Sequence, residues 1–385
     1  MIFQYYLPVN LIFGRNEVKR VGEIASKYGK KVFLVTGKSS TKKTGALDLV
    51  CGCLAAAGIE SVIFDEVEPN PLTTTVMRGA SKCRAEGCDL VIGLGGGSVL
   101  DCAKAIALMA DNEGDISDYI FVRKVGEKAL PLILIPTTCG TGSEGNGFAV
   151  FTNSANGDKK ALKSEAIIAR VAIVDPCLME TMPKKILASV GFDALCHAME
   201  AYLSKVSQPL SKMMAKEAMQ LISRHLPKVY KGIGTDKDWE AISLASTLGG
   251  EAIWGAGITL PHAMEHPASG LRDIVHGEGL AALIPAITKV SIEKASNNPE
   301  DKAVLTKYAV ISKALGGVDA YDCVERITKF LEELNLKTNF TELGMKKEDV
   351  EWMSNNCLEV SAAGIQNHPI AFSKEEIFDI YNSVY

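Results

Sequence analysis

Short apolar runs rich in β-branched residues recur along the first half of the chain. They occupy residues 32–37 (VFLVTG), 61–67 (SVIFDEV), 89–94 (DLVIGL), 131–138 (PLILIPTT) and 171–176 (VAIVDP), and amphipathic stretches separate them. Strands that alternate with helices are typical of β-α-β units, in which helices cover both faces of a parallel sheet. The pattern therefore predicts a parallel α/β domain over residues 1–178.

The pattern changes after Pro183, where the strand signals stop. Residues 184–206 (KKILASVGFDALCHAMEAYLSKV) and 211–226 (SKMMAKEAMQLISRHL) have helical periodicity instead. We therefore expect an all-helical domain over residues 179–385. A chain of 385 residues is too long for one ordinary core, which agrees with two domains.

Composition limits the partners that this chain is expected to have. A net charge of -5 and the lack of a long Lys/Arg run argue against nucleic acid. No window reaches the roughly 18 uninterrupted apolar residues of a membrane span. Ten cysteines are scattered without a C-x-x-C pair, and no cationic signal segment opens the chain. We expect a cytoplasmic protein with reduced thiols that acts on small molecules, with no nucleic-acid or membrane partner.

A glycine-rich segment, GGGSVLDCAK at 95–104, directly follows a buried strand and opens a helix. Glycines let the backbone approach a phosphate, and free N–H groups at the helix start face the anion. Ser98 is expected to cap that helix. The alternative interpretation is a tight strand-to-helix turn without a ligand.

A second loop, TTCGTGSE at 137–144, follows the next apolar strand and offers several hydroxyl groups. Such a loop can bind a ribose, a diphosphate or a nicotinamide amide. A turn with capping residues and no ligand would have the same sequence pattern. Two such loops at the carboxyl ends of neighbouring strands favour a dinucleotide site.

Four of the six histidines lie close together in the helical half. Asp193 and His197 are four residues apart, as are His262 and His266, and His276 follows ten residues later. Residues four apart share a helix face, so each pair can point into one cavity. A single such histidine is more often a packed core residue, but the cluster favours a borderline metal such as zinc or ferrous iron.

The two remaining histidines lie outside this cluster. His225 is expected at the charged end of a helix before Pro227, and His368 in a C-terminal loop. Neither is assigned a function.

The order and spacing of these segments resemble the iron-containing (group III) alcohol dehydrogenase family. The resemblance rests on GGGSVLDCAK, TTCGTGSE, GFDALCHAMEAY and the run from His262 to HGEG, with LPVNLIFG, EPNP and IVDP in support, and it spans nearly the whole chain. The resemblance includes the family's NADPH-dependent butanol dehydrogenase and aldehyde reductase branch. The resemblance implies a Rossmann-like N-terminal domain, an all-helical C-terminal domain and a metal-dependent oxidoreductase of aldehydes and primary alcohols.

The resemblance also implies roles for individual residues. Fe²⁺ or Zn²⁺ would be held by Asp193, His197, His262 and His276, while His266 matches a family histidine near the substrate. Asp101 either orients the cofactor or substrate or compensates the helix dipole. Cofactor positions are matched by Gly96, Gly97 and Ser98 at the pyrophosphate and by Asn70, Thr137, Thr138, Thr141, Lys159 and Leu178 around the remainder.

The residues after the 32–37 strand bear on the choice of nucleotide. Family members that use NAD often carry an aspartate there, which repels a 2′-phosphate, whereas this chain has Gly37, Lys38 and Ser39. Lys38, Lys42 or Lys43 would add attraction, although surface lysines also serve solubility alone. We therefore expect a preference for NADP(H), with NAD(H) as the alternative.

His266 is the candidate for proton transfer. Hydride transfer to a carbonyl leaves negative charge on its oxygen, and imidazole titrates near working pH. His266 would act directly or through a water or ribose hydroxyl; the alternative is a structural side chain packed beside Pro267. The few charged residues beside the metal motifs favour short- or medium-chain aldehydes and primary alcohols over acids.

Other interpretations of the sequence stay open. One is a glycerol dehydrogenase-like polyol oxidoreductase that uses NAD, and another is a non-catalytic nucleotide or metal binder. The extended N-terminal LPVNLIF is expected to pair as an edge strand across a two-fold axis, which favours a homodimer. Cys139 and Cys196 are interpreted as inert small hydrophobes or as oxidation-sensitive thiols.

Overall fold

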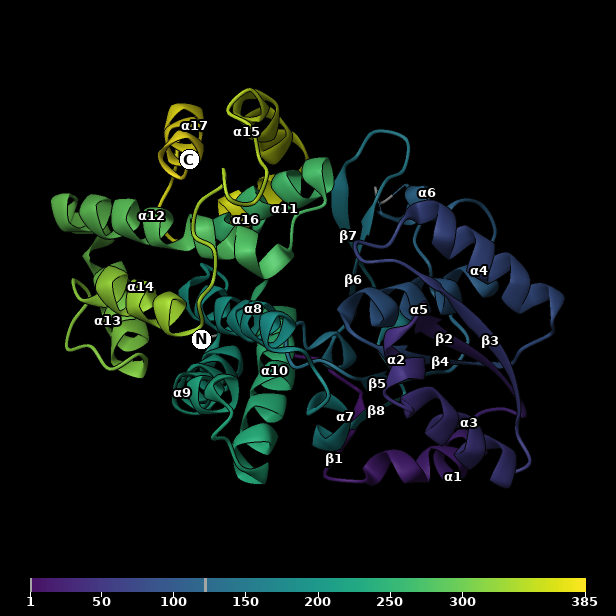
Figure 1. Ribbon diagram of the computed structural model, residues 1–385. Helices are drawn as coiled ribbons and strands as arrows, with labels where there is room; N and C mark the ends of the chain where they lie inside the picture. The colour runs from purple at the N-terminus through teal and green to yellow at the C-terminus, as the bar shows by residue number, and fades with distance from the viewer. Residues whose placement is uncertain (1, 121–122) are drawn as a thin grey trace. The chain divides into compact units, whose positions relative to one another are not determined.

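The computed structural model describes residues 2–120 and 123–385, and its backbone contacts divide the chain between Met182 and Pro183 (Figure 1). Gln4–Met182 forms an α/β unit, and Pro183–Tyr385 forms a helical unit. Residue 178, where the sequence placed the boundary, lies in the short helix α7 (Pro176–Met179). The predicted fold class, α/β followed by all-helical, is confirmed.

A six-stranded parallel sheet forms the centre of the α/β unit, in the order β1-β8-β5-β4-β2-β3. All five predicted strands are present. The N-terminal LPVNLIF segment supplies a sixth, which pairs with β8 of its own chain and forms one edge of the sheet. The strands are β1 (Asn10–Phe13), β2 (Lys31–Gly37), β3 (Glu60–Val67), β4 (Leu90–Gly95), β5 (Leu132–Pro136) and β8 (Val171–Val174).

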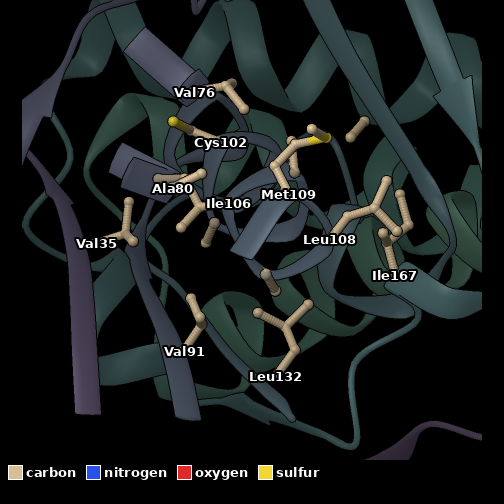
Figure 2. Close-up of a cluster of buried hydrophobic side chains, with 14 of the residues drawn as sticks. Val35, Val76, Ala80, Val91, Cys102, Ile106, Leu108, Met109, Leu132 and Ile167 are labelled. Carbon is tan, nitrogen blue, oxygen red and sulfur yellow. The ribbon is translucent and has the colours of Figure 1, made fainter. Parts of the chain in front are cut away.

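Helices cover both faces of this sheet because successive strand side chains point to opposite sides. Phe33 and Val35 of β2 pack in a cluster with α4 (Thr73–Ala85) and α5 (Gly97–Ala110), part of which Figure 2 shows. Val32 and Leu34 face the other way, toward a cluster that includes α1 (Val21–Ala25) and α3 (Ala46–Ala56). Because helices bury both faces, side chains on both sides of such a strand are apolar, and the strand appears in the sequence as a continuous apolar run.

An antiparallel hairpin, β6 (Phe148–Thr152) and β7 (Lys159–Lys163), lies outside the main sheet and was not predicted. Its second strand, KKALK, is lysine-rich and only partly buried, so it lacks the apolar run that marked the other strands. The hairpin is attached to α5, because Asp101 accepts a hydrogen bond of 2.9 Å from the Val150 amide.

Residues 183–385, all of which the structure describes, contain ten α-helices and no strand. One apolar core lies among α11, α12, α15 and α17. The helices are α8 (Lys184–Leu203), α9 (Pro209–Lys231), α10 (Asp236–Ala256), α11 (Leu260–Arg272), α12 (His276–Asn297), α13 (Lys302–Ala314), α14 (Cys323–Glu333), α15 (Asp349–Val360), α16 (Ala362–Asn367) and α17 (Lys374–Ser383).

Helix α9 corrects one prediction from the sequence. It was expected to end before Pro227, but it continues through that proline to Lys231 and ends at Gly232, whose φ is 77°. A proline inside a helix removes one backbone hydrogen bond. The packing of α9 against α8 and α10 offsets that loss. His225 is therefore inside the helix, where its Nδ1 lies 2.7 Å from Asp238 Oδ1.

Helix α8 is long and apolar enough to cross a membrane by length and composition alone, and it is the one such helix among the described residues. Its apolar window is 83% buried inside the protein. A core helix of this kind passes the same test, and α8 also carries Asp193, His197 and Glu200. We therefore interpret it as a core helix.

Candidate functional site

The four predicted metal ligands come together within the helical unit. Asp193 and His197 lie one turn apart on α8, His262 is near the start of α11, and His276 is the first residue of α12. Pro261 lies in the first turn of α11, where a missing N–H costs nothing. Helix α8 and the consecutive helices α11 and α12 thus bring together one carboxylate and three imidazoles.

The carboxylate oxygen Oδ1 of Asp193 is the centre of this cluster. It lies 3.3 Å from His262 Nε2, 3.7 Å from His197 Nε2 and 3.7 Å from His276 Nε2. The ligand atoms of Asp193, His262 and His276 all lie within 4.8 Å of one another. His197 joins the group through its contact with Asp193 and its ring, which stacks on His262 with centroids 4.6 Å apart.

These residues fit a divalent cation. Asp193 Oδ1 and His262 Nε2 are buried and have no hydrogen-bond partner among the described residues, although such atoms are normally satisfied. Ligand atoms about 2.1 Å from a tetrahedral ion lie about 3.4 Å apart, close to the separations found here. One carboxylate and three imidazoles are also a donor set that zinc and ferrous iron accept.

Two glutamates that the sequence reasoning missed contact the outer nitrogens of the histidines. Glu200 Oε1 lies 2.5 Å from His262 Nδ1, and Glu265 Oε2 contacts His276 Nδ1. Both carboxylates are buried. Each follows a predicted ligand by three residues, His197 and His262 respectively, so the H-x-x-E spacing was a usable signal in the sequence.

The electrostatics of the cluster favour ionised carboxylates. Burial would raise the pKa of Asp193, but the neighbouring histidines outweigh burial and hold this pKa below its usual range. Burial lowers the pKa of His197 to about 4, so this imidazole is neutral. For His262 the carboxylates of Glu200 and Asp193 outweigh burial and raise the pKa to about 10. Cationic charge is therefore stabilised beside Asp193.

His266 lies beside the predicted ligands. It is buried, and its ring centroid lies 5.8 Å from that of His276 and 6.0 Å from that of His262. Its ligand atom also groups with those of Glu265 and His276. This position fits a side chain near the reacting atoms, and its role stays a prediction.

The two glycine- and threonine-containing loops of the α/β unit pack directly on each other. A Cβ on Gly97 would lie 2.4 Å from Thr141 Cγ2, and one on Gly96 would lie 3.3 Å from Thr138. The Thr137 amide donates to Gly95 O at 2.9 Å. The helix α5 begins at Gly97 with Gly96 at its N-cap, so Ser98 is inside the first turn and does not cap the helix as predicted.

Asp101 and Lys104 belong to a buried polar network behind these loops. Asp101 accepts from Ser143 Oγ at 2.6 Å, and Lys104 Nζ donates to Ser143 Oγ and to Phe148 O, each at 2.7 Å. Asp101 is outside the first turn of α5, so it does not act on the helix dipole there. Burial lowers the pKa of Lys104 to about 8.

The other predicted cofactor residues belong to the same unit. Gly37 ends β2, and Lys38 and Ser39 follow it at the exposed surface. Lys42 pairs with Asp65, whereas Lys38 forms no ion pair with any residue that the structure describes. Lys159 Nζ donates to Asn70 Oδ1 at 2.9 Å, and Leu178 is buried in the core next to the sheet.

The two cysteines singled out in the sequence are buried. Cys139 and Cys196 are 1% and 0% exposed. Burial raises the pKa of the Cys139 thiol to about 12 and that of Cys196 well above its usual value. Neutral, inaccessible thiols are inert, which favours the first of the two interpretations.

Comparison with known proteins agrees with this geometry. The model of the iron-containing alcohol dehydrogenases matches residues 8–176, and that of the C-terminal part of the same family matches residues 187–385. The chain belongs to the iron-containing alcohol dehydrogenase family. This iron-containing alcohol dehydrogenase is thus an oxidoreductase, and its family implies a metal, a nicotinamide cofactor and small alcohol or aldehyde substrates.

Relatives of this alcohol dehydrogenase differ in nucleotide and substrate. The NAD-dependent methanol dehydrogenase of Bacillus methanolicus is 33% identical, with 92% of this chain and 93% of the relative covered. The NADPH-dependent butanol dehydrogenase of Clostridium saccharobutylicum is 32% identical, with 100% and 98% covered. A solved 1,3-propanediol oxidoreductase superposes with a TM-score of 0.90 at 34% identity, with both chains covered completely.

Proposed function

We propose that this protein is a metal-dependent aldehyde reductase and alcohol dehydrogenase that prefers NADP(H). The observation that carries the proposal is the group of three imidazole nitrogens within 3.3–3.7 Å of Asp193 Oδ1. The proposed substrates are short- or medium-chain aldehydes and primary alcohols. Relatives whose names specify propanediol, butanol and methanol support this range.

Asp193, His197, His262 and His276 would hold Fe²⁺ or Zn²⁺. When bound, the cation stabilises negative charge on the substrate oxygen, and the nicotinamide supplies or accepts the hydride. Burial of Asp193, His197 and His262 keeps water away from their donor atoms, which strengthens the electrostatic interactions among them. His266 would carry a proton on its ring nitrogen toward the substrate oxygen.

The α/β unit would bind the nucleotide. The backbone N–H groups of Gly97 and Ser98, at the start of α5, would donate hydrogen bonds to the pyrophosphate. Gly96 and Gly97 leave the loop without side chains there, while Thr137, Thr138 and Thr141 offer hydroxyls. The Asn70–Lys159 pair and Leu178 would line the remainder of the site.

The preference for NADP(H) rests on residues 37–39. Gly37 brings no negative charge, and the exposed Lys38 has no ion-pair partner in the described chain. A 2′-phosphate is therefore not repelled at this position, and a nearby ammonium group attracts it.

We also propose a cytoplasmic homodimer. All ten cysteines are free, which suits a reducing compartment. The strand β1 is an edge strand, and its outer edge would pair with a second copy. Light scattering on the eluted protein tests the dimer, and a monomeric mass would contradict it.

The decisive experiment measures aldehyde-dependent oxidation of NADPH and NADH on protein loaded separately with Fe²⁺ and with Zn²⁺. We expect turnover of aliphatic aldehydes, faster with NADPH, and complete loss on chelation with the helical circular dichroism retained. An Asp193→Asn variant should lose the metal. Full activity in a chelated protein that is shown to be free of metal would refute the proposal.

A further inference from the structure

The buried glutamates behind the histidines form a crossed pattern over three helices. Glu200 belongs to α8 but contacts His262 of α11, and Glu265 belongs to α11 but contacts His276 of α12. Each carboxylate thus contacts a predicted ligand on a different helix. The pattern connects the three helices that carry the ligands.

Glu200 is held on both of its oxygens. Oε1 lies 2.5 Å from His262 Nδ1, and Oε2 accepts from the Thr259 amide at 2.6 Å and from Thr259 Oγ1 at 3.1 Å. The side chain is 1% exposed. A buried carboxylate with its lone pairs engaged in this way has a fixed position, and its charge needs a positive counterpart.

Glu265 is buried in a similar way on α11. It is 0% exposed, contacts His276 Nδ1 through Oε2, and accepts from Ser269 Oγ at 3.2 Å through the same oxygen. A Cβ on Gly279 of α12 would approach Glu265 Cγ to 2.9 Å, so α12 also packs on this side chain.

The chemical consequence concerns the histidine tautomer. A carboxylate at Nδ1 keeps the proton on that nitrogen, which leaves the Nε2 lone pair for a metal. The Nε2 atoms of His262 and His276 are the ones that lie 3.3 and 3.7 Å from Asp193 Oδ1. A negative charge behind the ring also makes the imidazole a stronger donor.

We propose that Glu200 and Glu265 are positioning residues that fix His262 and His276 in the metal-binding tautomer and orientation. This inference rests on the proposed metal centre. His197 differs from the other two, because its ion-pair contact among the described residues is through Nε2, to Asp193, whereas His262 and His276 each have a carboxylate at Nδ1. The two glutamates therefore position two of the three histidines that are proposed as ligands.

The test measures metal affinity without reference to turnover. Wild type, Glu200→Gln and Glu265→Gln are stripped of metal, and Zn²⁺ affinity is determined by competition with a chelating dye. Loss of an outer carboxylate typically weakens a site 10- to 100-fold, and we expect that range for each variant. The absorption spectrum of the Co²⁺-loaded protein should also shift, because the histidine geometry changes.

A matched control exists in the same unit. Asp238 forms a carboxylate–histidine pair with His225 at 2.7 Å, and neither residue is among the predicted ligands. Asp238→Asn should leave the Zn²⁺ affinity and the Co²⁺ spectrum within twofold of wild type, even if it lowers the unfolding temperature. Thr259→Val is a milder variant that keeps every carboxylate, and it should weaken Zn²⁺ binding a few-fold.

The outcomes separate this inference from the function on which it rests. Wild-type affinity in both glutamine variants, together with loss of binding in Asp193→Asn, overturns the positioning role and leaves the metal centre intact. Failure of wild type to bind Zn²⁺, Fe²⁺ or Co²⁺ overturns both. If the glutamine variants do not fold, Thr259→Val decides the question: unchanged affinity there refutes the role of Glu200.

Discussion

The nucleotide preference can be tested at a single position. Gly37 ends β2, and a Cβ built there would meet no heavy atom closer than 3.7 Å, the Cγ2 of Val99. Its φ is outside the left-handed region, since Gly37 is absent from the residues with positive φ. A Gly37→Asp substitution should therefore fold without steric cost, so any change in activity reports the added charge.

The expected size of the effect follows from electrostatics. Two unit charges 4 Å apart interact by about 1 kcal/mol in water and by about 4 kcal/mol at the effective dielectric typical of a protein surface. Repulsion of a 2′-phosphate by the new carboxylate should therefore reduce kcat/KM for NADPH by about 5- to 1000-fold. The same carboxylate can accept hydrogen bonds from the ribose hydroxyls of NADH, which should improve its use.

The assay compares kcat/KM for NADPH and NADH with one aldehyde at fixed ionic strength. Gly37→Asn is the control, because asparagine has nearly the same volume as aspartate without its charge. We expect the NADPH/NADH ratio to fall steeply in the aspartate variant and to change little in the asparagine variant. Equal ratios in the two variants, or a wild-type preference for NADH, would refute the charge argument.

Two further predictions concern other buried groups. Lys104→Met should lower the stability of the α/β unit by about 3–5 kcal/mol, because the carboxylate of Asp101 and the three acceptors of the ammonium group stay buried without it. Calorimetry of the full chain should show a lower unfolding midpoint for this variant and an unchanged midpoint for Lys38→Met, which removes an exposed ammonium group. Equal midpoints in the two variants would contradict the network. His266→Asn should keep full metal content, measured by elemental analysis, while kcat falls about 100- to 10,000-fold if His266 carries the proton. A fall in kcat of less than threefold would indicate that His266 has a structural role.

Much of the fold could be predicted from local pattern. The five apolar runs became β2, β3, β4, β5 and β8. In β2, β4, β5 and β8 the run is continuous because a strand buried on both faces needs apolar side chains throughout, whereas the edge strand β3 is only partly buried. The histidine spacing also predicted a cluster correctly, since residues four apart on a helix share one face. The hairpin β6–β7 and the length of α9 were missed, because their stability comes from contacts with other elements.

The amino-acid sequence by itself therefore determined the order of the elements, the carboxylate and imidazole side chains at Asp193, His197, His262 and His276, and the absence of an acid at Gly37. Only the tertiary structure decided which atoms meet. It brought Asp193 Oδ1 within 3.3 Å of His262 Nε2, and it paired Glu200 with a histidine 62 residues away. Periodicity reports the face of one helix, whereas the register between helices depends on packing across the whole core.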